Sequence, residues 1–209
     1  MELLLVRHAL PIRVEGGPGP ADPALAPAGL DQARALAAHW APRVDALWTS
    51  PMRRARETAR PLEEALGVAA TVDDDLAEMD RDADAYIPLE ELRSDPAAWA
   101  EAVEAWTGPE GEAMRAAFRV RVGAAIDRVV AAHPGARVAV VCHGGVINAA
   151  AADAIGLGSA LFFEPGYVSV SRVAAHRTGA RTLLSLNETW HVDGSVAPTG
   201  PGPGGRVGA

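Results

Sequence analysis

The 209-residue sequence has no lysine, a single cysteine and no excess of positive charge. The one cysteine, Cys142, excludes a disulfide framework and the spacing of a zinc finger. A formal net charge of −8 argues against nucleic acid as a partner, because nucleic-acid-binding domains usually carry a basic surface. All 19 basic residues are arginines. An anionic ligand would therefore need a local cluster of arginines.

Signals for secretion and for membrane insertion are also missing. The apolar run at the start of the chain is interrupted at Arg7 and has no basic segment before it, so we expect neither a signal peptide nor a membrane span. The composition, 49% hydrophobic and 22% charged, is that of a globular protein and differs from that of disordered chains. The sequence therefore predicts a cytoplasmic protein without a membrane partner.

Segments typical of strands and of helices alternate along the chain. Residues 2–6 and 138–142 are continuous apolar runs, which are typical of strands buried on both faces. This alternation predicts an α/β fold, a three-layer α/β/α sandwich with a mainly parallel central sheet. The other predicted strands are 44–50, 167–175 and 181–187, and the predicted helices are 27–42, 52–67, 111–135 and 147–157.

The length of the chain suits one domain, which we place at residues 1–193. Within it, the acidic and irregular stretch at about 71–109 is expected to be an insertion that covers the site. Residues 194–209 are rich in glycine and proline without a repeat, which predicts a flexible tail.

Polar residues stand at the ends of four predicted strands: Arg7-His8, Thr49-Ser50, His143 and Asn187. In open α/β sheets, ligands bind in the crevice outside the carboxyl ends of the strands. If these strands are parallel neighbours, their polar ends converge on one site.

Arginines join this group, because Arg53, Arg54 and Arg56 begin the helix that follows the second strand. Guanidinium groups and helix N-termini both bind phosphate oxygens well. A neutral imidazole is a competent nucleophile toward phosphorus when its other nitrogen is held as a donor. The combination of histidines and arginines therefore suits phosphoryl transfer.

Four segments carry a family resemblance: LLLVRHA, SPMRRARETA, DLAEMD and VVCHGGVI. In this order and at similar spacing, they resemble the four motifs of the histidine phosphatase superfamily, in its phosphoglycerate mutase-like branch. The resemblance extends from about residue 2 to residue 190. It implies a phosphoglycerate mutase-like fold and a metal-independent phosphomonoesterase that acts on a small phosphorylated metabolite.

The resemblance also implies roles for individual residues. His8 matches the residue that is transiently phosphorylated, and Arg7, Arg54 and His143 match the residues that surround the phosphate. Arg54 is chosen over its neighbours because it begins the family's R-A-x-x-T-A pattern. Glu78 matches the acid that protonates the leaving oxygen and then activates water. We therefore expect His8, Glu78 and His143 to be catalytic, Arg7 and Arg54 to bind substrate, and no metal or cofactor to take part.

The sequence departs from the family pattern on the side of the substrate. Ala9 stands where a glycine usually follows the first histidine, and an alanine fits there only if its φ is negative. Apolar residues, Leu10, Pro11 and Ile12, replace the polar residues that commonly follow. After Glu78, the stretch MDRDADAYIP lacks the usual glycine and Trp-Glu-Gly run. These changes leave the phosphate pocket intact and alter the contacts to the rest of the substrate.

Other interpretations stay open. A mutase would return the phosphoryl group to a bound product, but family mutases carry longer insertions, so hydrolysis is favoured. A module that binds a phosphorylated ligand without turnover would require Glu78 to be misplaced. A metal site on His8 and His143 is disfavoured, since no carboxylate or further histidine lies at ligand spacing. The sequence leaves open the substrate, a homodimeric state, and contacts of Arg13 or Glu112 with substrate.

Overall fold

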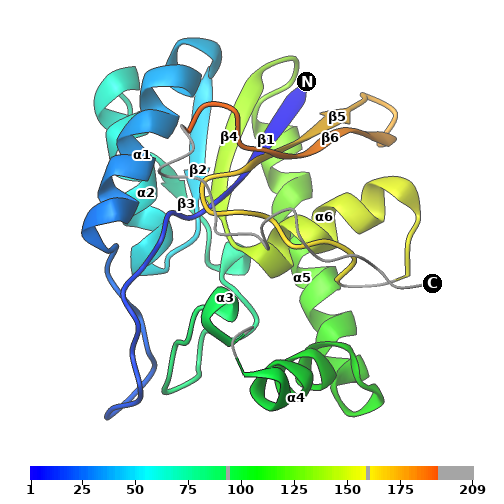
Figure 1. Cartoon of the computed structure of the whole chain (residues 1–209). Coiled ribbons are helices and arrows are strands. Elements are labelled where there is room, and N and C mark those ends of the chain that lie inside the picture. The colour runs from blue at the N-terminus through cyan, green and yellow to red at the C-terminus, as the bar shows by residue number, and fades with distance from the viewer. Residues whose placement is uncertain (93–94, 159–160, 193–209) are drawn as a thin grey trace, which may run out of the picture.

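The computed structural model describes residues 1–92, 95–158 and 161–192. Within them, six strands form one sheet in the order β3-β2-β4-β1-β5-β6 (Figure 1). The first four strands in this order run parallel, and β5 is antiparallel to both of its neighbours. The predicted mainly parallel sheet is confirmed. The strands are β1 (Glu2–Arg7), β2 (Ala46–Thr49), β3 (Thr71–Val72), β4 (Arg137–Cys142), β5 (Val170–Ala175) and β6 (Arg181–Glu188).

Helices cover both faces of the sheet, as the three-layer prediction requires. On one face lie α1 (Pro27–Trp40) and α2 (Arg53–Leu66), and on the other lie α5 (Glu112–Ala132) and α6 (Gly144–Ile155) (Figure 1). Two further helices, α3 (Leu89–Leu92) and α4 (Pro96–Thr107), lie beyond the carboxyl edge of the sheet. Short 3₁₀ helices span Ala41–Arg43, Asp74–Leu76 and Pro109–Gly111.

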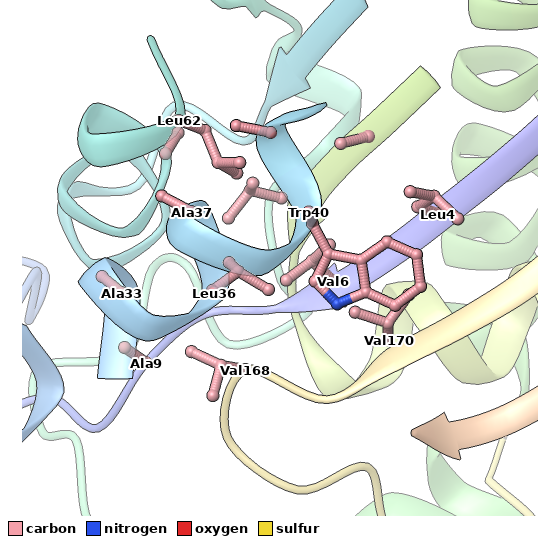
Figure 2. Packing of buried hydrophobic residues seen from close by; sticks show 14 of the residues in the cluster. Leu4, Val6, Ala9, Ala33, Leu36, Ala37, Trp40, Leu62, Val168 and Val170 are labelled. Carbon is pink, nitrogen blue, oxygen red and sulfur yellow. The ribbon is translucent and has the colours of Figure 1, made fainter. Parts of the chain in front are cut away.

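Strand β1 is buried on both faces because it lies between the two helical layers. Leu4 and Val6 pack against Trp40 of α1 in the cluster that Figure 2 shows. Leu3 and Leu5 belong to the second cluster, with α5 and α6. The continuous apolar run in the sequence thus reflects two buried faces. The strand leaves this core at its carboxyl end, which is where Arg7 and His8 lie.

Several element boundaries differ from those predicted. Helix α2 continues through Pro61, and it ends as predicted at Gly67, whose φ is 68°. Helix α6 begins at Gly144, three residues before the predicted start. The stretch 71–109 is less irregular than predicted, since it contains β3, α3 and α4. Its role as an insertion over the site stays a prediction, and the predicted tail at 194–209 lies outside the described residues.

Candidate active site

The carboxyl ends of β1, β2 and β4 bring three of the predicted polar strand ends together. Arg7 at the end of β1 pairs in register with Cys142 of β4, so His8 and His143 leave the sheet side by side. Their ring centroids are 5.2 Å apart. The Nε2 atom of His143 is 2.7 Å from the Oγ atom of Ser50, which follows β2. This convergence follows from the parallel order of the strands.

The fourth polar strand end, Asn187, lies at the same edge of the sheet, where its side chain binds the loop that precedes β5. Its Oδ1 atom accepts a hydrogen bond from the backbone N–H of Gly166 at 2.7 Å. The adjacent Pro165 accepts a hydrogen bond from Arg7, so Asn187 supports the loop that holds this arginine.

A cavity of about 320 Å³ opens at this edge, and Arg7, His8, Arg54 and Glu78 all line it. The predicted site residues therefore come together from β1, α2 and the segment after β3. His143 is fully buried beside His8 and is not part of the lining. A cavity of this size matches a small-molecule ligand.

His8 is held as a neutral imidazole with a defined tautomer. Its Nδ1 atom is 2.8 Å from the backbone carbonyl oxygen of Ala9. Because a carbonyl oxygen only accepts, Nδ1 carries the proton and Nε2 keeps its lone pair. Burial lowers the pKa of His8 well below its usual value, and the positive charges of Arg54 and Arg7 lower it further. The ring is thus prepared to act as a nucleophile through Nε2.

Arg7 is fixed by the loop that precedes β5. Its Nη1 atom donates to the carbonyl oxygen of Pro165 at 2.6 Å, and its guanidinium carbon lies 4.0 Å from the centre of the Tyr167 ring. The loop is anchored by Val168, whose N–H donates to the carbonyl oxygen of Arg7 and whose φ is 51°. A β-branched residue at positive φ is strained, and such strain is often stored next to functional sites.

Arg54 is the most buried cation of the site, with 1% of its surface exposed. It contacts Asp80 at 3.4 Å and lies 4.6 Å from the centre of the Tyr86 ring. Its Nε and Nη1 atoms and the Nδ1 atom of His143 are buried without a hydrogen-bond partner among the described residues. Unsatisfied buried donors are costly, and a phosphate dianion would satisfy them with charge-assisted hydrogen bonds. The geometry therefore favours an anion beside Arg54.

Glu78 supplies a carboxyl group in the same cavity. Its oxygens accept hydrogen bonds from the backbone N–H groups of Gly145 at 2.8 Å and Met79 at 2.9 Å. Burial, with a smaller contribution from the charge of Asp80, raises the pKa of Glu78 to about 7. A β-carbon on Gly145 would lie 2.3 Å from a Glu78 oxygen, so only glycine permits this approach. Glu78 is thus able to carry a proton near neutral pH.

Thr58 connects His8 to Arg54. Its hydroxyl accepts the N–H of Ala9 at 2.9 Å and donates to the carbonyl oxygen of Arg54 at 2.7 Å. Ala9 has no positive φ, which is the condition under which an alanine replaces the usual glycine there. The R-A-x-x-T-A pattern in α2 therefore provides a tether for the loop after β1 as well as an arginine.

Sequence reasoning missed part of the lining. Tyr86 and Phe163 line the cavity, and neither belongs to a motif or to a periodic pattern that would have indicated it. Asp80 was visible in the sequence as the last residue of the DLAEMD segment and as an alternative to Glu78 for the acid. The position of the threonine in the R-A-x-x-T-A pattern was the available signal for Thr58.

Some residues that the sequence left open lie away from the site. Arg13 forms ion pairs with Glu15 and Glu91, and neither Arg13 nor Glu112 lines the cavity. Cys142 is buried in the core, and burial raises the pKa of its thiol. This thiol has the character of a packing residue.

The comparisons with known proteins agree with this geometry. The model of the histidine phosphatase superfamily, branch 1, matches residues 3–189. A protein of Hydrogenobacter thermophilus named "Putative phosphoserine phosphatase 2" is 30% identical over 197 residues, which cover 90% of this chain and 96% of that protein.

Solved structures share the fold. A phosphoserine phosphatase mutant from Entamoeba histolytica, in complex with phosphoserine, is 18% identical with a TM-score of 0.69, over 91% of this chain and 98% of that chain. A mycobacterial glucosyl-3-phosphoglycerate phosphatase is 23% identical with a TM-score of 0.70, over 90% and 99%. The family model spans nearly the whole chain, and together with the relative from Hydrogenobacter it identifies a phosphatase family. The chain belongs to the histidine phosphatase superfamily, branch 1.

Proposed function

We propose that this phosphatase hydrolyses small phosphomonoesters through a phosphohistidine intermediate on His8. The observation that carries the proposal is the position of His8, a neutral imidazole with a fixed tautomer in the cavity that Arg7, Arg54 and Glu78 also line. These groups supply the nucleophile, the stabilising cations and the proton that phosphoryl transfer requires.

In the first step, Arg7 and Arg54 bind the phosphate oxygens and neutralise their charge. The lone pair on Nε2 of His8 attacks phosphorus and forms a P–N bond, while the P–O bond to the alcohol breaks. Protonated Glu78 gives its proton to the leaving oxygen, and the alcohol departs. The proton stays on Nδ1, which donates to the Ala9 carbonyl oxygen, and this hydrogen bond stabilises the positive charge on the phosphorylated ring.

In the second step, the Glu78 carboxylate removes a proton from water. The water oxygen attacks phosphorus, the P–N bond breaks, and inorganic phosphate leaves. His8 is again neutral and Glu78 is again protonated. A mutase would instead return the phosphoryl group to a bound alcohol. Measuring inorganic phosphate released from a panel of small phosphomonoesters therefore tests hydrolysis against that alternative.

The rate is expected to fall above about pH 7 for substrates with alkoxide leaving groups. The pKa of Glu78 is raised to about 7, so its acid form predominates below this pH and is lost as the pH rises through it. The pH profile of kcat/KM for an alkyl phosphate should therefore decline on its alkaline side. An aryl phosphate with a good leaving group should show a weaker decline in its phosphorylation step. An alkyl phosphate profile that stays flat to pH 9 would contradict this role of Glu78.

Activity is expected to survive removal of divalent metal ions. Among the described residues, no group of three or more His, Cys, Asp or Glu side chains lies close enough to hold a metal ion. The arginines take the part that a metal ion plays in other phosphatases. Initial rates with and without EDTA should agree. A loss in EDTA that added Mg²⁺, Mn²⁺ or Zn²⁺ restores would show that the proposed mechanism lacks a component.

Location and assembly stay predictions from the sequence. In the part of the chain that the structure describes, no helix is long and apolar enough to cross a membrane. We propose a cytoplasmic enzyme, because small phosphorylated metabolites are its proposed substrates. The homodimer that the sequence left open awaits a measurement of mass in solution.

A further inference from the structure

The charges around the cavity are distributed unevenly. Among the described residues that line it, Arg7 and Arg54 are the cationic side chains, and the other charged side chains are the carboxyl groups of Glu78, Asp80 and Glu164. Two guanidinium groups match the charge of one phosphate dianion. Asp80 already contacts Arg54 at 3.4 Å, which reduces the positive charge that remains. The described lining therefore has no further cation for a second anionic group of a substrate.

Two uncharged hydrogen-bond donors of the lining, the Asn148 amide and the Gly145 N–H, are engaged within the protein. Asn148 lines the cavity, and its Nδ2 atom donates to the carbonyl oxygens of Gly144 and Phe163, both at 2.9 Å. Its Oδ1 atom accepts from the N–H groups of Phe162 and Phe163. The N–H of Gly145 donates to Glu78. A substrate carboxylate would therefore lose its hydration without gaining these donors.

Apolar side chains provide much of the remaining wall. The stretch MDRDADAYIP, which differs from the family pattern, contributes Ala85, Tyr86 and Ile87 as well as Asp80. Leu92 of α3 and Phe163 of the loop after α6 lie on the same lining. The departure from the family pattern after Glu78 thus produces an acidic and apolar wall beside the phosphate-binding arginines.

We propose that this wall selects phosphomonoesters whose alcohol part is uncharged or cationic, and that it disfavours those whose alcohol part carries a carboxylate. The proposal rests on the proposed function, because it assigns the substrate class of the same site. Glu78 is uncharged when it acts as the acid, so the carboxyl groups of Asp80 and Glu164 are the ones that repel a substrate carboxylate and attract an ammonium group. An apolar alcohol gains from contact with Tyr86, Ile87 and Phe163.

Matched pairs of substrates test the proposal on the full chain. Glycerol 1-phosphate is compared with 3-phosphoglycerate, and phosphoethanolamine with phosphoserine, because each pair differs chiefly by a carboxylate. We expect kcat/KM to be at least about tenfold lower for the carboxylate-bearing member of each pair. Equal values, or a preference for the carboxylate, would overturn the proposal. Failure of the proposed function is a separate result, in which no member of either pair releases inorganic phosphate.

Variants of Glu164 test whether the wall sets the ratio of kcat/KM values between the two members of each substrate pair. Glu164→Gln is expected to reduce the preference in kcat/KM for the carboxylate-free substrate by about threefold. Glu164→Arg is expected to change the same preference by at least about tenfold in favour of the carboxylate-bearing substrate. Because each ratio is taken within one preparation, a general loss of activity cancels. Glu64→Gln is the control, since it removes an exposed carboxylate on α2 outside the cavity. Ratios that are the same in the wild type and in both Glu164 variants would contradict the role of this wall.

Discussion

Replacing His8 by alanine is expected to lower kcat for every phosphomonoester by at least about four orders of magnitude. The substitution removes the only atom that forms the P–N bond in the proposed mechanism, whereas Arg7 and Arg54 remain. The measurement is inorganic phosphate release under saturating substrate. Binding of inorganic phosphate, followed by calorimetry, is expected to persist, because the cations that hold the anion are unchanged.

The control for this variant is His176→Ala, which removes an exposed histidine in the turn between β5 and β6. It should retain wild-type kcat, and both variants should unfold near the wild-type temperature. If His8→Ala keeps more than about one hundredth of the wild-type kcat while remaining folded, His8 is not the nucleophile.

Glu78→Gln is expected to slow alkyl phosphates by about two to four orders of magnitude, because the amide cannot give a proton to an alkoxide leaving group. An activated aryl phosphate needs little assistance from an acid, so formation of the phosphoenzyme from it should suffer much less. Rapid-quench measurements of the released phenol, compared with steady-state rates, separate the two steps. The contrast between substrates distinguishes loss of an acid from a general disturbance of the site.

Two carboxylates near Glu78 provide the comparison. Asp82 is exposed and lies outside the cavity lining, so Asp82→Asn should behave like the wild type. Asp80 lines the cavity and contacts Arg54. If Glu78→Gln leaves all substrates unaffected and Asp80→Asn produces the loss, Asp80 is the acid and the assignment to Glu78 is wrong.

Much of the fold could be predicted because its central strands, β1, β2 and β4, are buried on both faces. Such strands give continuous apolar runs, as at 2–6 and 138–142, and their polar ends mark the edge where a parallel sheet binds ligands. The positions of Arg7, His8 and His143 follow from this rule alone. Arg54 and Glu78 needed the family motifs, because single arginines and glutamates at a surface carry little information.

The rest of the site depends on contacts that leave weak traces in a sequence. Helix α4 was not predicted, although Asp95 followed by Pro96 is a signal for a helix start. The side chain of Asp95 accepts hydrogen bonds from the N–H groups of Ala97 and Ala98. Tyr86 reaches Arg54 only because the chain folds back after β3. Tyr86 lines the cavity because of the tertiary structure, and the hydrophobic pattern of the sequence does not indicate this.

The claim that His8 carries the phosphoryl group is tested most directly by trapping the intermediate in Glu78→Gln. In this variant, an activated aryl phosphate should still phosphorylate His8, while hydrolysis of the phosphoenzyme is slowed because water lacks its base. After rapid quenching, we expect a phosphoryl group that is stable in base, labile in acid and located on His8 by peptide mass analysis. It should be absent from His8→Ala. A phosphoryl group on another residue, or no phosphoenzyme at all in a preparation that binds phosphate, would contradict the account and favour a module that binds phosphorylated ligands.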